Sequence, residues 1–371
     1  MNLIKIGSGC GVLLASIVAV HATATQTPEP RTLPISRTVV SPEVLPDRRV
    51  TFRIYAPKAS DVLVLIGGER TKMEKDERGV WSVTVGPLPS DSYAYFFRVD
   101  DMPVPDVKNV EVLSALNGFI YSSVFVPGPD AEFMENKAVP HGEVRRVWYR
   151  SSTLGVQRRM HVYTPPGYEA TSTPYPVLYL LHGGGELDSS WSTVGRAGFI
   201  VDNLIASQKA TPMVVVMPDV PVPPARDRFV EELLKDIVPH VEKTYRVRAG
   251  RDARALAGFS VGGYQTLNVL TSHSAAFCCL GVWSAPVEPK TVVMFGQEQK
   301  RFLSDADQIN KRMKLLWFRM GSEDMGIPHV KALTAMLTEH GIKHDLKISA
   351  GTHSWQNWRR YLHEFAQAIF R

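Results

Sequence analysis

A serine lies between two glycines in the segment 258–262, whose sequence is Gly-Phe-Ser-Val-Gly. Ser260 follows a short strand predicted over 255–257 and precedes a helix predicted over 264–270. A sharp strand-to-helix turn needs small residues on both sides of the serine, because the backbone is tightly bent there. Such a turn lifts the Ser260 hydroxyl above the sheet edge and offers the Val261 amide to a developing oxyanion. The segment therefore predicts nucleophilic chemistry on an acyl group.

A second glycine-rich turn, His-Gly-Gly-Gly over 182–185, follows the buried strand predicted over 176–181. In serine hydrolases whose nucleophile lies on a strand-to-helix turn, a glycine-rich turn of this kind supplies a further backbone amide to the oxyanion. We expect that amide to be the one of Gly183 or Gly184. We expect His182 to brace the turn rather than to titrate in catalysis.

A serine hydroxyl needs a general base, and the base needs an acid that fixes its tautomer. In hydrolases with such a nucleophile turn, the three groups follow one another along the chain in the order nucleophile, acid, base. Asp324 comes just after the strand predicted over 315–318, and Glu323 beside it is the alternative acid. His353 stands between the strand predicted over 346–348 and the last helix, so we expect it to be the base.

Three tryptophans are predicted in loops or at strand ends, where an aromatic acyl group could stack: Trp191, Trp283 and Trp355. No metal or organic cofactor is expected, because the serine mechanism supplies its own nucleophile and base.

Buried strands that alternate with amphipathic helices must position these groups. Near-continuous apolar runs are typical of strands buried on both faces, and they occur at 176–181, 213–217 and 315–318. Apolar residues at helical spacing occur over 229–241, 330–337 and 355–369. This alternation predicts an α/β fold over 143–371, an open and mostly parallel sheet with helices on both faces.

A different pattern precedes that region. Short alternating strands with turn residues between them are predicted over 50–55, 61–66, 79–85 and 93–99. Strands at this spacing predict a small all-β sandwich, which we place at 46–128. A polar linker over 129–142 follows it.

The first 24 residues have the features of a secretory signal peptide. Lys5 precedes an apolar run over 12–20, and small residues lead to a cleavage site after Ala24. The run is short for a membrane span, so we expect a secreted or periplasmic protein with no stable membrane insertion after cleavage. An uncleaved anchor is the alternative. Residues 25–45 are rich in Thr, Pro and Ser and are interpreted as a flexible leader.

Composition excludes several classes of protein. The 371 residues are 44% hydrophobic and 21% charged, which argues against a disordered or fibrous chain. The formal charge of +5 comes without a basic run, so no nucleic-acid partner is expected. Three cysteines cannot form a disulfide framework, and the adjacent Cys278 and Cys279 are predicted in a buried strand. The oligomeric state stays open.

These motifs together resemble secreted esterases of the α/β-hydrolase superfamily. More narrowly, the chain resembles the feruloyl-esterase and enterochelin-esterase-like group of carbohydrate esterase family one. The matching segments follow one another in the order 182–185, 191–197, 232–239, 258–263, 321–324 and 353–355. The β-sandwich is similar to the early-set domain, related to glycogen-binding modules, that often precedes such esterases.

The resemblance implies ester hydrolysis through an acyl-enzyme on Ser260, with His353 as base and then acid and Asp324 orienting it. Typical substrates of the group are hydroxycinnamoyl or acetyl groups esterified to plant polysaccharide, so the expected partner is a glycan-linked ester. A siderophore-type esterase and an acyltransferase are alternatives, and a catalytically silent glycan-binding protein is an alternative of another class. The proline-rich loop 219–226 is shorter than in relatives and can line the acyl pocket. We expect the sandwich to position or wall the active site.

Overall fold

The computed structural model describes residues 34–223, 225–285, 296–297 and 299–371. The signal peptide predicted over 1–24 and much of the leader lie outside the described residues. The chain divides into two units, Met1–Thr38 and Val39–Arg371. In the first unit the structure describes one short helix, α1 (Ile35–Thr38). Among the helices in the described ranges, none combines the length and apolar character that crossing a bilayer requires.

The second unit begins with two antiparallel sheets, called the sandwich below. One has the strand order β1-β2-β6-β5, with β1 Glu43–Val44, β2 Val50–Tyr55, β5 Glu74–Lys75 and β6 Val80–Val85. The other has the order β4-β3-β7-β10-β9 with β8 beside β7, and its strands are β3 Val62–Ile66, β4 Glu69–Lys72, β7 Asp91–Val99, β8 Met102–Val104, β9 Val112–Ser114 and β10 Ile120–Val126.

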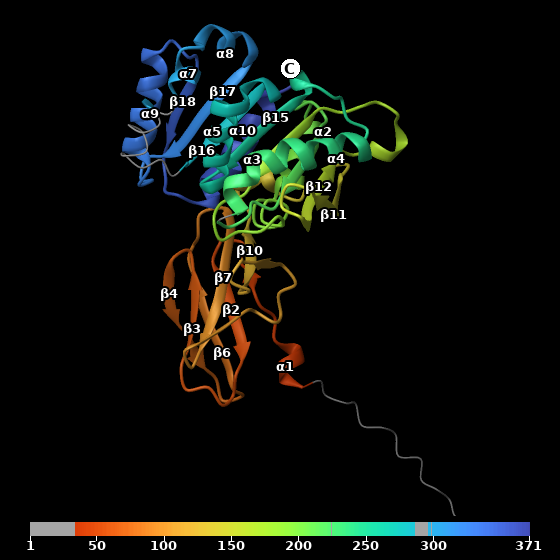
Figure 1. The fold of residues 1–371 in the computed structure, drawn as a ribbon. Helices are drawn as coiled ribbons and strands as arrows, with labels where there is room; N and C mark the ends of the chain where they lie inside the picture. The colour runs from red at the N-terminus through yellow and green to blue at the C-terminus, as the bar shows by residue number, and fades with distance from the viewer. Residues whose placement is uncertain (1–33, 224, 286–295, 298) are drawn as a thin grey trace, which may run out of the picture. The chain divides into compact units, whose positions relative to one another are not determined.

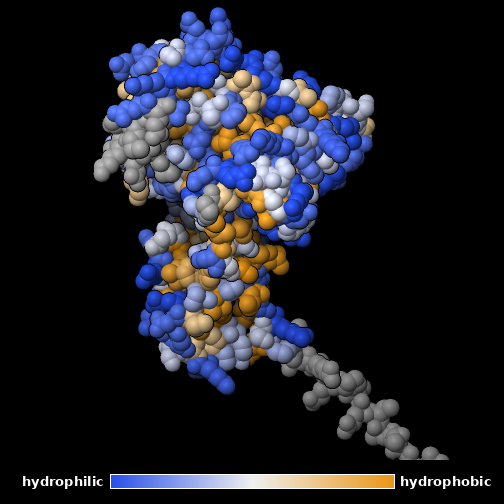
Figure 2. All heavy atoms as spheres, in the orientation of Figure 1, coloured by the Kyte–Doolittle hydropathy of each residue, from blue (hydrophilic) through white to orange (hydrophobic). Residues whose placement is uncertain are grey.

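Alternation of buried and partly exposed residues is clearest in strands β3 and β10. In β3, Val62, Val64 and Ile66 are buried, because successive side chains of a strand point to opposite faces. Strand β1 lies within the segment interpreted as leader, and it pairs with the start of β2. On the face shown in Figure 2, hydrophobic residues gather over the sandwich, and its exposed apolar side chains include Leu116 and Ile120.

An eight-stranded sheet follows, and with its helices it is called the α/β region. The strand order is β11-β12-β14-β13-β15-β16-β17-β18 (Figure 1). The strands are β11 Glu143–Ser151, β12 Val156–Thr164, β13 Val177–Leu181, β14 Val214–Pro218, β15 Arg254–Phe259, β16 Cys279–Trp283, β17 Leu315–Gly321 and β18 Asp345–Ser349. The six strands from β14 to β18 in this order pair in parallel, whereas β11 and β12 are antiparallel. The predicted mostly parallel sheet is therefore present.

Apolar clusters on both faces of this sheet hold helices against it. One cluster contains residues of α2 (Ala197–Ala206) and α10 (Trp355–Ala368). The other contains residues of α3 Phe229–Glu232, α4 Val238–Thr244, α5 Val261–His273, α7 Lys300–Leu303, α8 Ala306–Arg312 and α9 Ile327–Glu339. All residues of β13, β14 and β16 are buried, which explains their near-continuous apolar sequences.

The helix predicted over 229–241 departs from a regular α-helix in its middle. Residues Leu233–Ile237 form a π-helical turn between α3 and α4. Pro239 has no backbone N–H to donate to the carbonyl four residues earlier, so the regular ladder is interrupted there. The adjacent cysteines Cys278 and Cys279 are buried and free, as predicted, but only Cys279 lies in a strand, β16, and Cys278 comes just before it.

Buried polar contacts join the sandwich to the α/β region. Arg359 of α10 is 1% exposed, and its guanidinium donates to an Asp91 carboxylate oxygen and to the carbonyl of Ser92 on β7. The same guanidinium donates to the Val194 carbonyl at 2.7 Å. The Leu116 amide donates to the Gly185 carbonyl at 3.0 Å. The two regions thus share hydrogen bonds next to the predicted site.

Candidate active site

Ser260 occupies a strained turn between β15 and α5. Its backbone angles are φ 53° and ψ −121°, a conformation that residues with a Cβ rarely adopt. The glycines on either side of Ser260 make the turn possible, because other backbone atoms lie too close to them to leave room for a side chain. A Cβ on Gly258 would lie 2.6 Å from the Gly262 carbonyl carbon, and one on Gly262 would lie 2.6 Å from the His182 oxygen. The glycine spacing in the sequence is therefore required by backbone packing.

The glycine-rich turn lies directly against this elbow. A Cβ on Gly183 would lie 3.1 Å from the Ser260 Cβ, and one on Gly184 would lie 3.1 Å from the Val261 Cγ2. Val261 begins α5, so its N–H has no acceptor within the helix. Within the described part of the chain, the Gly184 amide likewise donates to no acceptor. Two unpaired backbone donors thus lie beside the Ser260 side chain.

His182 braces the glycine-rich turn, as predicted. The side chain is 2% exposed, and its Nδ1 lies 2.8 Å from the Gly183 carbonyl oxygen. The Val220 amide donates to Nε2 at 2.8 Å, so the ring proton is on Nδ1 and is donated to that carbonyl. Because C=O and N–H point in opposite directions across a trans peptide, this bond also sets the direction of the Gly184 N–H.

Asp324 and His353 meet at the carboxyl ends of β17 and β18. His353 Nδ1 lies 2.8 Å from Asp324 Oδ2, and the Gly326 amide donates to Oδ1 at 2.9 Å. Burial alone would raise the pKa of the Asp324 carboxyl, but the hydrogen bonds from His353 and Gly326 outweigh it and hold that pKa below its usual value. The His353 side chain is 37% exposed, whereas that of Asp324 is 2% exposed. Glu323, the alternative acid, is exposed.

Trp358 of α10 connects these groups. Its ring stacks on Phe259 at a centroid distance of 3.8 Å and meets the His353 ring edge-on at 5.0 Å. Its Nε1 donates to the Ser284 hydroxyl at 3.2 Å. Ser284 is 1% exposed with φ 44°, and its hydroxyl helps to lower the pKa of the Asp324 carboxyl. The Trp358 indole therefore contacts Phe259, the His353 imidazole and the Ser284 hydroxyl.

The three predicted tryptophans differ in accessibility. Trp191 is 1% exposed and Trp283 is 0% exposed, and their rings meet at 6.0 Å. The expected substrate contacts of these two are therefore wrong, because packing between the sheet and α10 leaves them no free face. Trp355 is partly buried and donates to Glu186 Oε1 at 3.1 Å.

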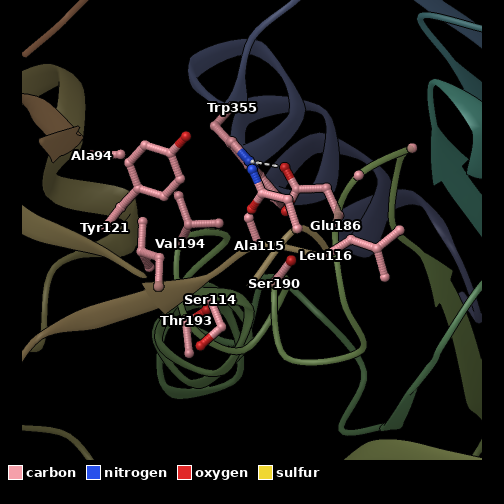
Figure 3. Close-up of a pocket in the computed structure, with 14 residues that line it drawn as sticks. Ala94, Ser114, Ala115, Leu116, Tyr121, Glu186, Ser190, Thr193, Val194 and Trp355 are labelled. Carbon is pink, nitrogen blue, oxygen red and sulfur yellow. Dashed lines mark hydrogen bonds between the residues drawn. The ribbon is translucent and has the colours of Figure 1, made fainter. Parts of the chain in front are cut away.

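A cavity of about 620 Å³ lies beside Trp355, between the sandwich and the α/β region (Figure 3). Figure 3 shows Leu116 and Tyr121 from the sandwich, and Glu186 hydrogen-bonded to Trp355 from the α/β region. The wall also includes Gly184 of the glycine-rich turn. The sandwich thus supplies part of a cavity that reaches Gly184, one of the predicted oxyanion donors.

Sequence reasoning missed Ser284, Glu186 and the sandwich residues of this cavity. Ser284 follows a buried strand and Glu186 follows the glycine-rich turn, and both positions at strand ends were available as signals. Across the described ranges, no cluster of three or more His, Cys, Asp or Glu side chains is arranged to hold a metal ion.

Comparisons with known families match both regions. Residues 151–369 match the family described as "Putative esterase". Residues 40–112 match carbohydrate-binding module 48, the isoamylase N-terminal domain.

Individual relatives agree with these matches. The endo-1,4-beta-xylanase/feruloyl esterase of Xylanibacter ruminicola is 30% identical in an alignment 339 residues long, which covers 86% of this chain and 44% of that protein. The chain thus spans less than half the length of this relative. The solved CE1 ferulic acid esterase of Anaeromyces mucronatus is 26% identical with a TM-score of 0.54, covering 66% of this chain and 96% of that one. The enterobactin esterase of Shigella flexneri has a TM-score of 0.61 at 18% identity, covering 86% of this chain and 92% of that one, and shows the fold alone.

Proposed function

This chain belongs to the esterase family that its residues 151–369 match, a family of carboxylic-ester hydrolases, and from that premise we propose that it hydrolyses esters through an acyl-enzyme on Ser260. The observation that carries the proposal is the strained backbone of Ser260, which aims a hydroxyl out of a turn whose glycines leave no room for side chains.

The neighbouring groups support a complete mechanism. His353 takes the proton of the Ser260 hydroxyl as it attacks the ester carbonyl, and Asp324 holds the imidazole in the required tautomer and stabilises the imidazolium. The Val261 amide and that of Gly183 or Gly184 receive the developing oxyanion. His353 then gives the proton to the leaving alcohol, and a water molecule hydrolyses the acyl-enzyme by the same steps in reverse.

For the substrate we propose hydroxycinnamoyl or acetyl groups esterified to plant polysaccharide. The relative from Xylanibacter ruminicola and the solved ferulic acid esterase support the acyl part, and the match to a carbohydrate-binding module supports the glycan. The siderophore-type and acyltransferase alternatives have no specific observation in the site that favours them. A silent binding protein would have no use for a strained serine beside two free amides.

Hydrolysis of p-nitrophenyl acetate and methyl ferulate by residues 25–371 tests the proposal. We expect Ser260→Ala to abolish turnover and labelling by a fluorophosphonate probe. Ser272→Ala, an exposed serine at the far end of α5, is the matched control and should behave like wild type. A wild type that neither turns over an ester nor takes the label would refute the enzyme and leave the binding protein.

We also propose export of the chain with cleavage after Ala24. Expression with a secretion-competent host and N-terminal sequencing of the mature protein test this. A mature chain that still begins with Met1 at the membrane would instead identify the uncleaved anchor.

A further inference from the structure

Strand β11 forms one edge of the eight-stranded sheet, next to β12 (Figure 1). Alternate residues of a strand share a face, so Arg146, Trp148 and Arg150 lie on one face of β11. Trp148 is 61% exposed, and both arginines are exposed. These three residues are called the edge patch below. The patch offers an aromatic ring to solvent, with a positive charge about 7 Å away along the strand on either side.

The charge of the edge patch has no counter-charge on the protein. Across the described ranges, neither Arg146 nor Arg150 forms an ion pair. The facing residues of β12 include no acid, and by register they are Gln157, Arg159 and His161. Burial lowers the pKa of His161, and the charges of Arg159 and Arg146 lower it further, so the nearby histidine adds no negative charge. A ligand with negative charge is the electrostatic complement of this face.

A fixed ion pair supports the Trp148 ring. The guanidinium carbon of Arg159 lies 5.8 Å from the centroid of that ring. Two donors of the Arg159 guanidinium bond to the two carboxylate oxygens of Asp188, whose side chain is 0% exposed. The His161 ring also lies 3.1 Å from the Asp188 carbonyl oxygen. The ring is therefore held before any ligand arrives, and this reduces the entropy lost on binding.

Protection of an edge strand explains the arginines of the patch but not its tryptophan. Charged side chains on an edge strand hinder pairing with another chain. A large exposed ring between them works against this purpose, because exposed apolar surface favours association. The edge patch therefore has the features of a binding surface.

The composition of the patch also selects among anionic partners. An anionic membrane would need a wider apolar surface than Trp148 and Val144, the two large exposed hydrophobic residues of β11. A nucleic acid would need more than two arginines, because binding depends on the number of phosphates neutralised. An acidic polysaccharide fits both components. Its sugar rings present C–H faces to the indole, and each uronate carboxylate accepts two hydrogen bonds from one guanidinium.

The edge patch lies toward the same edge of the sheet as Ser260. Trp148 pairs with Arg159, and the next residue, Met160, pairs with Pro218 at the carboxyl end of β14. Ser260 follows the carboxyl end of β15, and four strand spacings separate β15 from β11, about 19 Å across the sheet. None of the edge-patch residues lines the cavity of Figure 3. An extended polymer whose ester lies at Ser260 would reach the patch with a distant part of its chain.

From these observations we propose that the edge patch is a binding site for an acidic polysaccharide, with Trp148 stacked on a sugar ring and Arg146 and Arg150 bound to uronate carboxylates. The site is separate from the one that holds the reacting ester, and it anchors the polymer that carries the ester. The glycan nature of the ligand rests on the proposed function, whereas binding at the patch requires no turnover.

Binding is measured by titration calorimetry on the chain with Ser260→Ala, so that the acyl groups of the polymer stay in place. The two ligands are a soluble xylan with glucuronate side groups and a neutral arabinoxylan. We expect the further change Trp148→Ala to weaken binding of the glucuronate-bearing xylan about tenfold. Tyr55→Ala removes a ring that is 38% exposed on the sandwich. It is the matched control and should leave the affinity unchanged.

The charge of the patch has its own measurement. Arg146→Gln combined with Arg150→Gln should weaken binding of the glucuronate-bearing xylan about fivefold at low salt and make it less dependent on salt. Binding of the neutral xylan should not change. Arg70→Gln combined with Arg301→Gln removes two exposed arginines that form no ion pair within the described part of the chain. This control should leave both affinities unchanged.

Thermal melting shows which variants are folded. Unchanged affinity in folded Trp148→Ala, or equal affinity of the parent chain for the two xylans, overturns the site. Polyglutamate that competes as well as the glucuronate-bearing xylan would identify an acidic peptide as the ligand and also overturn it. Failure of the proposed function is distinguishable, because it appears as a wild type without p-nitrophenyl acetate turnover or fluorophosphonate labelling. Trp148→Ala in the wild-type background should leave kcat/KM for p-nitrophenyl acetate unchanged.

Discussion

Two carboxylates pair with nitrogen groups around the first turn of α10. Asp324 pairs with His353 at 2.8 Å just before the helix, and Asp91 of the sandwich pairs with Arg359 at 2.5 Å within it. Both carboxylates are almost fully buried. Their partners differ, because the His353 side chain is 37% exposed and that of Arg359 is 1% exposed.

This difference separates the pair that we propose exchanges protons from a pair that fixes structure. An imidazole that must gain and lose a proton needs access to substrate and water, and only one of its nitrogens is engaged by Asp324. Burial lowers the pKa of Arg359 and the Asp91 carboxylate partly offsets this, while the carbonyls of Ser92 and Val194 each accept one further hydrogen bond from the guanidinium. A buried charge of this kind needs a counterion and hydrogen-bond acceptors close to it.

Breaking the first pair should have the largest effect, and it should act on the rate. We expect Asp324→Asn to lower kcat for p-nitrophenyl acetate about 10³- to 10⁴-fold, because the amide favours the wrong imidazole tautomer. Its neighbour Glu323→Gln is the matched control, since Glu323 is exposed, and should retain activity. Equal losses in the two variants would contradict the assignment of Asp324 as the acid.

Breaking the second pair should act on stability. Asp91→Asn leaves the Arg359 guanidinium buried without its counterion, which costs about 3–5 kcal/mol. Urea unfolding measures this loss, and Asp101→Asn, with a side chain 95% exposed on the same region, should change the free energy of unfolding by less than about 0.5 kcal/mol. Combining Asp91→Leu with Arg359→Met should recover most of the stability. A double variant as unstable as Asp91→Asn would show that the charges themselves are required.

A substitution with a smaller expected effect on kcat tests the contact between Trp358 and Ser284. Ser284→Ala removes a hydrogen bond to the Asp324 carboxylate, so the pKa of Asp324 should rise toward its usual value. We expect kcat to fall about fivefold to thirtyfold, equivalent to roughly 1–2 kcal/mol. Ser322→Ala, an exposed serine after β17, is the control. A variant with unchanged kcat would mean that Ser284 supports only the packing of Trp358.

The smallest effect concerns acid stability. Because the pKa of Asp324 is lower in the folded chain than in the unfolded one, its ionised form stabilises the fold above about pH 4. This contribution is lost as the pH falls through the folded pKa. Unfolding free energies measured between about pH 5 and 2.5 should therefore fall less steeply in Asp324→Asn than in wild type. Parallel curves would contradict the lowered pKa.

Local sequence signals predicted the parts of this site that depend on local backbone. The glycines around Ser260 have a steric reason that lies within the turn itself, and strand β2 has the predicted bounds Val50–Tyr55. His353 and Asp324 could be selected because parallel strands bring their ends to one sheet edge. Their contact at 2.8 Å follows from that topology.

Other features depend on packing between distant segments. The burial of Trp191 and Trp283 follows from where α10 crosses the sheet, and nothing in their flanking sequence specifies it. The cavity needs Leu116 beside Gly185, two residues far apart in the chain. Ser284 matters because a tryptophan much later in the chain donates to it. Periodicity within a window cannot detect such pairs.

The Arg359 contacts bear on how this chain can be cut and recombined. A transplant of the α/β region alone would carry an arginine whose acceptors on β7 had been left behind. The relative from Xylanibacter ruminicola aligns over 339 residues, a length greater than the α/β region alone, inside a longer enzyme that also bears a xylanase name. The portable cassette is therefore the sandwich and the α/β region together, and engineers who graft this activity should move both.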